Sequence, residues 1–474
     1  MSGAGVAAGG RVGEVADALT LRGWAVDPAA GREGAAELVV ADGRLERVSW
    51  LSGADADGIE DRGLLLVPGF VDLHAHLREP GNEDAETVAT GLAAAAHGGF
   101  TTVCAMPNTT PATDDPGIVG RVRSAAAATG SPVRLLVHGA VTTGRGGETL
   151  APLGELADAG VAGFSDDGAP VANASILRNA LAYAGTLGLP IIEHPEDPTL
   201  TDGAEASEGY VATVLGLRGW PVAAESGAVA RAIAILTDVV RDVPAARLHL
   251  THVSTAAALG HVRVAKASGL PVSCDVTPHH LALSDEWIAG SRRWAWDAVD
   301  DAGAARDPWA DGALVAAPFD PSLRVNPPLR SPADAAACLA AVADGTADAI
   351  ATDHAPHTEV DKRVEFGWAA NGISGIETAI GLVLEAVDAG RLPLGRAIEA
   401  LTIGPASVLR RSDVVPGLRE DEPADLVVID RGAAWRVEPD ALRSRGKHSP
   451  LIGRDLPGVV RLTIAAGRVA YAAD

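Results

Sequence analysis

Short β-branched runs alternate with alanine-rich stretches between about residues 64 and 410. Such runs predict buried strands and the stretches between them predict helices, which is the pattern of repeated β/α units. Eight runs are present, and they end near residues 73, 106, 141, 165, 193, 252, 276 and 353. Eight parallel strands, each followed by a helix, predict an α/β fold with a TIM (β/α)8 barrel over residues 64–412.

Polar side chains cluster where the predicted strands end. The carboxyl ends of barrel strands surround one mouth, so residues far apart in the sequence meet there. The side chains in question are His74, His76, Asn108, Asp166, Asp167, His194, His252 and Asp353. The sequence therefore predicts a single site at the barrel mouth.

The two ends of the chain follow a different pattern. Residues 35–49 and 461–474 each contain a strand, a glycine turn and a second strand. We expect residues 1–63 and 413–474 to pair into one small β-sandwich domain beside the barrel.

Composition favours a soluble cytoplasmic protein. The chain has 474 residues and 47% hydrophobic content, enough for a sizeable core. No apolar stretch reaches the roughly 18 residues of a membrane span, and the N-terminus lacks an export signal. Cys104, Cys274 and Cys338 are widely spaced, which predicts buried, reduced thiols rather than a disulfide framework.

A net charge of -24 argues against nucleic-acid and membrane partners. An anionic small substrate would need a local arginine to hold it. The sequence thus favours a small-molecule enzyme over a binding protein for polyanions.

His74 and His76 have the spacing of metal ligands. Residues two apart on a strand point to the same face, with Cβ atoms roughly 6 to 7 Å apart, so both imidazoles can converge on one ion. The arrangement suits zinc. On its own, a His-x-His pair is weak evidence, and the other polar strand ends strengthen it.

Motifs along nearly the whole chain resemble the amidohydrolase superfamily and, within it, the type I dihydroorotases. They are HAHLREPG, MPNTTP, FSDDGAPV, EHPEDP, THVST, DVTPHH, RVNPPLR and ATDHAPH. The resemblance implies the reversible conversion of N-carbamoyl-L-aspartate to (S)-dihydroorotate in pyrimidine biosynthesis. It also implies one or two Zn²⁺ per subunit, a homo-oligomer and a possible aspartate transcarbamoylase partner.

The resemblance assigns metal ligands residue by residue. His74 and His76 would bind a first metal, and His194 and His252 a second, with Asp167 bridging or supporting them. Strand alternation alone allows Asp166 as well as Asp167, and the SDDG pattern of the family favours the latter.

Many relatives bridge their metals with a carboxylated lysine. None of the three lysines, Lys266, Lys362 and Lys447, lies at a suitable strand end. This disfavours hydantoinase-like and dihydropyrimidinase-like interpretations.

Asp353 is the predicted general acid/base, because an amide nitrogen leaves poorly unless it is protonated. Asp353 is also predicted to be a metal ligand. Arg78 is predicted to hold the substrate carboxylate, since its planar fork matches a carboxylate. By resemblance, Asn108, Asn326 and His357 also bind substrate. For the two asparagines, stabilisation of their own proline-rich turns is the alternative.

Two further functions stay open at this point. One is another cyclic amidase, allantoinase-like or hydantoinase-like, and the other is a non-catalytic scaffold for aspartate transcarbamoylase. His279 and His280 are candidates for orienting a loop or a ligand, and the remaining histidines are predicted to pack.

One segment departs from the family pattern. Residues 286–323 form an extended insertion rich in tryptophan, with Trp287, Trp294, Trp296 and Trp309. We expect it either to fold over the barrel mouth or into a subunit contact, or to fold as a small self-packed hairpin.

Overall fold

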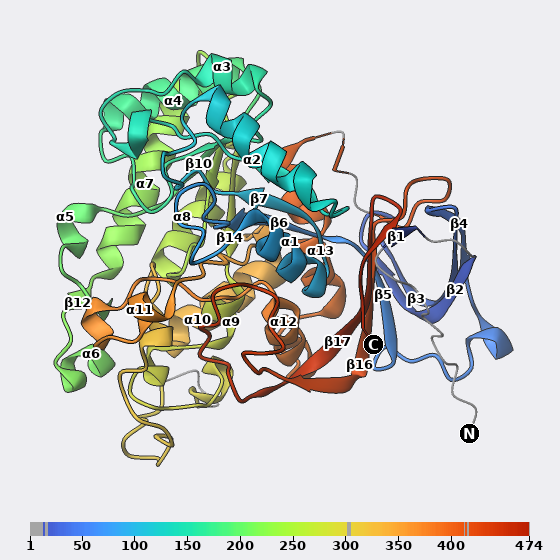
Figure 1. The fold of residues 1–474 in the computed structure, drawn as a ribbon. Helices are drawn as coiled ribbons and strands as arrows, with labels where there is room; N and C mark the ends of the chain where they lie inside the picture. Colours follow the sequence, from blue (N-terminus) through green and yellow to red (C-terminus); the bar gives the residue numbers. More distant parts are fainter. Residues whose placement is uncertain (1–12, 15–17, 301–304, 412, 415–416, 474) are drawn as a thin grey trace.

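The structure is a computed structural model that describes residues 13–14, 18–300, 305–411, 413–414 and 417–473. Helices and parallel strands make up one side of the molecule, and a strand-rich region built from both ends of the chain makes up the other (Figure 1). The strands are β1 (Gly13–Glu14), β2 (Leu19–Asp27), β3 (Arg32–Ala41), β4 (Arg44–Trp50), β5 (Leu64–Pro68), β6 (Phe70–Ala75), β7 (Phe100–Ala105), β8 (Arg134–Val137), β9 (Phe164–Ser165), β10 (Ile191–Glu193), β11 (Ala206–Ser207), β12 (Gly219–Trp220), β13 (Leu248–Leu250), β14 (Val272–Val276), β15 (Ala349–Ile350), β16 (Leu426–Arg436), β17 (Asp455–Ala465) and β18 (Arg468–Ala472).

Helices follow most of the parallel strands. They are α1 (Val88–His97), α2 (Pro116–Thr129), α3 (Leu153–Asp158), α4 (Ala174–Thr186), α5 (Pro198–Thr201), α6 (Tyr210–Leu215), α7 (Val222–Val239), α8 (Ala256–Ala267), α9 (Pro278–Ala282), α10 (Pro332–Asp344), α11 (Glu359–Lys362), α12 (Ala379–Asp388), α13 (Leu394–Leu401) and α14 (Ile403–Leu409). Side-chain caps start several of them: Thr87 caps α1, Asp115 caps α2, Thr255 caps α8 and Ser331 caps α10. Each cap satisfies a backbone N–H that would otherwise lack a partner.

The parallel strands occur in two runs of neighbours. One sheet has the order β6-β7-β8 and the other β9-β10-β13-β14-β15, and every pairing in both is parallel. Two isolated parallel bridges, Gly139 with Phe164 and Ala75 with His354, join the edges of these sheets. The strands end within a few residues of the predicted positions.

The chain ends form a β domain. Hydrogen bonds join its strands into one mixed sheet in the order β1-β18-β17-β16-β5-β2-β3-β4, in which only β2 and β5 are parallel among the described pairs. Hydrogen bonding therefore joins the strands of both chain ends into one continuous sheet, and the turn at Gly43 meets the turn at Gly467, so the sheet folds back on itself.

The first predicted barrel run is two strands in the structure. β5 pairs with β16 and β2 in the β domain, whereas β6 pairs with β7. Residues 64–68, which the sequence analysis assigns to the barrel, therefore lie in the sheet of the β domain. Gly69 makes the junction possible, because a Cβ atom there would lie 2.2 Å from the Thr101 hydroxyl oxygen.

Strand β5 contributes to both hydrophobic cores. Leu65 and Val67 belong to the large core that also holds Phe70 and Phe100, while Leu66 belongs to the core of the β domain. Successive side chains on a strand point to opposite faces, so one strand joins the two cores. The two parts of the protein are thereby packed as one unit.

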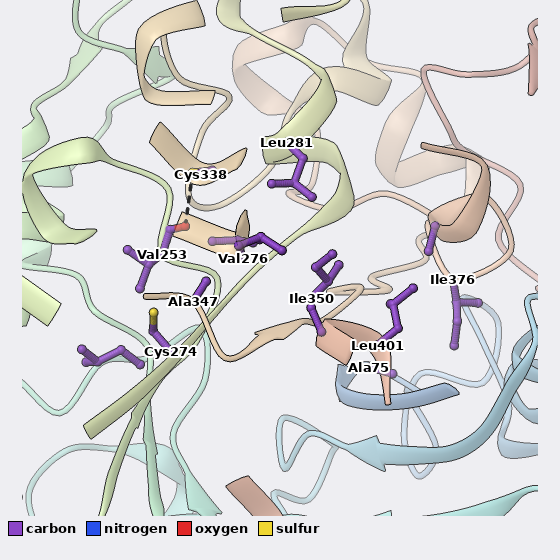
Figure 2. Packing of buried hydrophobic residues seen from close by; sticks show 14 of the residues in the cluster. Ala75, Val253, Cys274, Val276, Leu281, Cys338, Ala347, Ile350, Ile376 and Leu401 are labelled. Carbon is purple, nitrogen blue, oxygen red and sulfur yellow. Dashed lines mark hydrogen bonds between the residues drawn. The ribbon is translucent and has the colours of Figure 1, made fainter. Parts of the chain in front are cut away.

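All three cysteines are free and buried, as predicted. Figure 2 shows Cys274 and Cys338 among Val253, Val276 and Ala347 in the large core. No helix in the described part of the chain has both the length and the apolar character needed to cross a membrane.

The tryptophan-rich insertion joins the main core. Trp287, Trp294 and Trp296 are buried and stack in sequence, with ring centroids 5.8 and 5.7 Å apart. The Arg454 guanidinium lies 4.1 Å from the Trp294 ring centroid. Antiparallel bridges join Ser291 to Leu314 and Val299 to Ala305, so the described part of the insertion is hairpin-like and anchored in the core.

Candidate active site

The predicted metal ligands converge at the carboxyl ends of the parallel strands. All of them are buried, and each follows or ends a different strand apart from the pair on β6. They are His74 and His76 at β6, Asp167 after β9, His194 after β10, His252 after β13 and Asp353 after β15.

Asp167 lies between two pairs of histidines. Its Oδ2 atom is 3.3 Å from His74 Nε2 and 3.5 Å from His76 Nε2. Its Oδ1 atom is 3.1 Å from His194 Nδ1 and 3.3 Å from His252 Nε2. One carboxylate therefore faces both pairs, one oxygen to each, which is the arrangement of a bridging ligand between two cations.

Asp353 adds a second carboxylate to the first pair. Its Oδ1 atom is 3.1 Å from His76 Nε2 and 3.4 Å from His74 Nε2, and the two imidazole nitrogens are 3.1 Å apart. Nitrogen and oxygen donors this close fit a divalent metal, and imidazole with carboxylate is a donor set that zinc accepts.

The outward ring nitrogens fix the histidine tautomers. His74 Nδ1 contacts the Thr251 hydroxyl at 2.7 Å, and that hydroxyl has the Asp275 carboxylate as its acceptor. His76 Nδ1 donates to Asn108 Oδ1 at 2.8 Å, and His194 Nε2 donates to Glu196 at 2.9 Å. With the outward nitrogens held as hydrogen-bond donors, the inward nitrogens are the ones left to bind a metal once they lose their protons.

The site attracts positive charge. Burial alone would lower the pKa of His74, but the Asp167 and Asp353 carboxylates outweigh it and raise that pKa to about 9. Hydrogen bonds to Asp167 and Glu196 likewise overcome burial and raise the pKa of His194 to about 10. The same contacts hold the pKa values of Asp167 and Asp353 below the usual range. Metal binding should therefore displace protons from the histidines.

Asp166 has a different environment from Asp167. Its carboxylate accepts hydrogen bonds from the backbone N–H groups of Val141 and Thr142 at 2.8 and 3.1 Å, and from the Thr142 hydroxyl. It holds the turn after β8, while Asp167 faces the histidines. Strand alternation alone could not distinguish the two carboxylates, and the structure shows that Asp167 is the one that faces the histidines.

The three lysines are engaged elsewhere. Lys266 pairs with Asp348 at 2.6 Å, Lys362 binds main-chain oxygens of Arg324 and Ala370, and Lys447 binds the Leu442 carbonyl. Asp167, and not one of these lysines, lies between the two histidine pairs.

Arg78 and His357 lie together at the mouth. Arg78 Nε donates to the Pro356 carbonyl at 3.1 Å, and Nη2 is 3.3 Å from His357 Nε2. His357 Nε2 also lies 2.7 Å from the Asn371 carbonyl oxygen, which can only accept, so this nitrogen carries the hydrogen. Burial and Arg78 lower the pKa of His357 to about 3, so its ring is neutral. Arg78 Nη2 consequently has no acceptor there and is available to an anion.

A cavity of about 200 Å³ joins this arginine to the histidine and aspartate cluster. Its walls include Arg78, Asn108, Asn326 and His357, which are the four predicted substrate-binding residues. No described residue of the insertion at 286–323 lines it, so the mouth-cover interpretation of that segment has no support.

The two asparagines offer complementary groups. Asn108 Oδ1 accepts from His76, and its amide N–H groups donate to none of the described residues. Asn326 Nδ2 donates to Glu196 at 3.0 Å, and its Oδ1 atom has no partner among the described residues. One amide can donate to a ligand and the other can accept from it.

Three site residues adopt left-handed backbone conformations. Their φ angles are 59° for Arg78, 41° for His252 and 46° for Asp353. Such values are unfavourable for residues other than glycine and concentrate at functional sites. They turn these side chains into the cavity just after their strands end.

Sequence reasoning missed several supporting residues. Glu196 holds both His194 and Asn326, and Thr251 orients His74. Their positions, two after His194 and one before His252, were the available signal. His280, predicted to orient a loop or ligand, lies 3.2 Å from the Pro327 carbonyl and so supports the loop of Asn326.

Lys362 joins two loops of the mouth. Its buried ammonium donates to the carbonyl oxygens of Arg324 at 3.3 Å and Ala370 at 2.8 Å, next to Asn326 and Asn371 in their respective loops. Burial lowers the pKa of this group from 10.5 to about 7.

We expect Lys362→Met to change how stability depends on pH. Between the folded pKa near 7 and the ordinary value of 10.5, the unfolded wild-type chain binds a proton that the folded protein lacks. The free energy of unfolding of the wild type should therefore rise relative to the variant across this window, by a few kcal/mol at about 1.4 kcal/mol per pKa unit. Urea unfolding of both proteins at several pH values measures the difference, and a constant difference would contradict the lowered pKa.

Comparison with known proteins places the chain in a family. A family model described as dihydro-orotase-like matches residues 63–257. The dihydroorotase of Anaeromyxobacter dehalogenans is 44% identical over 467 residues, covering 97% of this chain and 99% of that protein. The dihydroorotase of Pelotomaculum thermopropionicum is 41% identical over 451 residues, covering 94% and 96%.

Solved structures show the same fold at lower identity. The L-hydantoinase (dihydropyrimidinase) of Arthrobacter aurescens has a TM-score of 0.74 at 24% identity and covers 94% of both chains. The dihydropyrimidinase of Brevibacillus agri has a TM-score of 0.73 at 20% identity, covering 96% of this chain and 95% of that one. Fold and site together define an enzyme of the cyclic amidohydrolase class. Within this class, the near-complete match to curated relatives is more specific. The chain belongs to the dihydroorotase family.

Proposed function

We propose that this protein is a dihydroorotase that interconverts N-carbamoyl-L-aspartate and (S)-dihydroorotate in pyrimidine synthesis. The observation that carries the proposal is that Arg78, whose Nη2 faces no acceptor among the described residues, lines the same cavity as three histidines and two aspartates of the cluster. A substrate ring that bears both a carboxylate and a hydrolysable amide needs both features. The curated relatives, named dihydroorotases, support the same reaction.

We propose that the eight parallel strands close into a barrel. The two parallel sheets and the bridges between Gly139 and Phe164 and between Ala75 and His354 support a continuous ring of eight strands. Closure would explain why residues from β6 and β15, the first and last parallel strands of the series, contact one another in the site.

The cofactor we propose is Zn²⁺, at two positions per subunit. His74, His76 and Asp353 would hold one ion, His194 and His252 the other, and Asp167 would face both. Bound zinc polarises a carbonyl and lowers the pKa of water, which supplies the electrophilic part of the chemistry.

The chain's own residues would do the rest. Arg78 binds the substrate carboxylate and orients the ring. Asp353 takes a proton from the attacking water and gives it to the departing ring nitrogen. In the reverse direction it takes a proton from the carbamoyl nitrogen and gives it to the departing hydroxide, which leaves as water. Asn108 and Asn326 present a donor and an acceptor to the polar edge of the ring, while His357 completes the wall beside Arg78.

Turnover of dihydroorotate by the purified, metal-analysed protein tests this function. We expect ring opening of dihydroorotate and little turnover of hydantoin or allantoin, which lack the pendant carboxylate. Preference for either of the latter would favour another cyclic amidase. Metal-replete protein that turns over none of the three, even with aspartate transcarbamoylase added, would favour a scaffold.

Metal stoichiometry gives a separate prediction. Wild-type protein should bind two zinc ions, and His252→Ala should bind one, because this change removes a nitrogen from one histidine pair only. His261→Ala, in the helix that follows, is the matched control. Elemental analysis after gel filtration measures both, and one ion in the wild type would contradict the two-metal arrangement.

Three expectations from the sequence complete the proposal. We propose a homo-oligomer located in the cytoplasm, with aspartate transcarbamoylase as a possible partner. Size measurement of the purified protein alone tests whether it is a homo-oligomer, and the same measurement with aspartate transcarbamoylase added tests whether the two enzymes form a complex.

A further inference from the structure

A loop of the β domain reaches back to the barrel mouth. Residues 437–454, here called the strap, connect β16 to β17. Backbone hydrogen bonds of 2.8 Å from Val437 to Arg454 and from Gly453 to Val437 close its base. In Figure 1 it leaves the strands of the β domain on the side of α9 and α12, and Leu451 shares a small enclosed space with residues of both helices.

Two buried carboxylates anchor the strap. Glu377 accepts hydrogen bonds from the backbone N–H groups of Arg443 and Ser444 at 2.7 and 3.1 Å. Glu86 accepts from the Ser444 hydroxyl at 2.6 Å and from the Arg445 N–H at 3.1 Å. Glu86 also lies 3.3 Å from His354 Nε2. The strap is thus tied to the residue that directly follows Asp353.

Gly446 presses against the loop that carries His357. A Cβ atom added at Gly446 would lie 2.7 Å from Pro356 Cβ, 2.8 Å from the His357 carbonyl oxygen and 3.0 Å from the His357 nitrogen. Behind it, the Gly446 carbonyl accepts from the Ser374 hydroxyl at 2.7 Å, and the Ser374 N–H donates to the His448 carbonyl at 2.8 Å. The strap therefore cannot retreat without breaking these bonds.

The opposite side of the same loop faces Arg78. The Pro356 carbonyl accepts from Arg78 Nε at 3.1 Å, and the His357 ring lies against Nη2. Any displacement of Pro356 and His357 by the strap would change the position of the guanidinium at the cavity.

We infer that the strap is a positioning element for the carboxylate-binding wall and that Gly446 is its positioning residue. This inference rests on the proposed function. Gly446 touches neither the cavity nor the metal ligands. It acts through the backbone of Pro356 and His357, which hold Arg78 at the angle that receives the substrate carboxylate.

Kinetics of Gly446→Ala and Gly446→Val test the inference. The added methyl groups should raise KM for dihydroorotate about tenfold or more, because a small misplacement of a binding group has large effects. The value of kcat and the zinc content should change little, since the cluster itself is not touched. Gly227→Ala is the matched control: a Cβ atom there meets nothing within 4 Å.

Each outcome has a distinct meaning. An unchanged KM in folded, zinc-replete Gly446 variants would overturn the positioning role, and so would a fall in kcat with KM constant. Should both variants fail to fold, Ser374→Ala decides, because it removes the shorter of the two side-chain hydrogen bonds to the Gly446 carbonyl without adding volume, and it too must raise KM. Wild-type protein without turnover or calorimetric binding of dihydroorotate would instead overturn the proposed function.

Discussion

Asp353→Asn should abolish ring opening while the protein retains its metal. Asparagine has nearly the same shape as aspartate, but its amide cannot accept the proton of an attacking water. General acid/base groups contribute roughly 10²- to 10⁴-fold to rate, so kcat should fall by that amount. Contacts with His74 and His76 hold the Asp353 carboxylate ionised, so it is a base before the reaction begins.

Metal retention distinguishes the two roles of Asp353. His74, His76 and Asp167 remain in place in the variant, and Asp167 contacts all four histidines. Lost zinc would make Asp353 chiefly a ligand, and normal kcat would exclude it as the acid/base. Asp197→Asn is the matched control near the mouth, because asparagine caps a helix as well as aspartate does.

Arg78→Ala should raise KM for dihydroorotate strongly. Arg78 is a cation of the cavity, and its Nη2 atom faces no acceptor among the described residues. Removing one partner of a buried charge pair costs about 2–5 kcal/mol, which corresponds to an increase in KM of roughly 30-fold or more. Arg78→Lys should not restore binding, because an ammonium lacks the planar fork.

The control for this prediction is Arg363→Ala. That arginine lies near the same mouth loop but pairs with Glu359 in solvent, and exposed pairs contribute little. A normal KM in Arg78→Ala would show that another group holds the carboxylate. Turnover of a ring without a carboxylate should be insensitive to the change, which separates substrate binding from damage to the metal cluster.

The residues of the site could be predicted because strand ends are marked in sequence. His74, His194, His252 and Asp353 follow β-branched runs, and parallel strands bring such ends together without any knowledge of side-chain contacts. The structure was needed to show which Asp167 oxygen faces which pair of histidines. Asp166 and Asp167 are adjacent, and only the turn at Val141 and Thr142 shows which of them is already occupied.

Other features depend on contacts between distant segments. Gly446 has no side chain, so nothing in the sequence marks it as a neighbour of His357. The split of the first predicted barrel run at Gly69 was likewise hidden, because residues on both sides of it are apolar. The tryptophans of the insertion predicted an ordered segment. The contact of Trp294 with Arg454, the last residue of the strap, joins two segments that are far apart in the sequence and could not be predicted from it.

The path of β5 has a consequence for the order of events during synthesis. β5 lies between β2, which is made earlier, and β16, which emerges only after the whole run of parallel strands has been translated. Until then one edge of β5 has no partner, and Leu66 has only part of its core. The strap follows β16, so the wall beside Arg78 is completed last. A nascent chain would thus carry every metal ligand before the strap that supports the substrate-binding wall has been made.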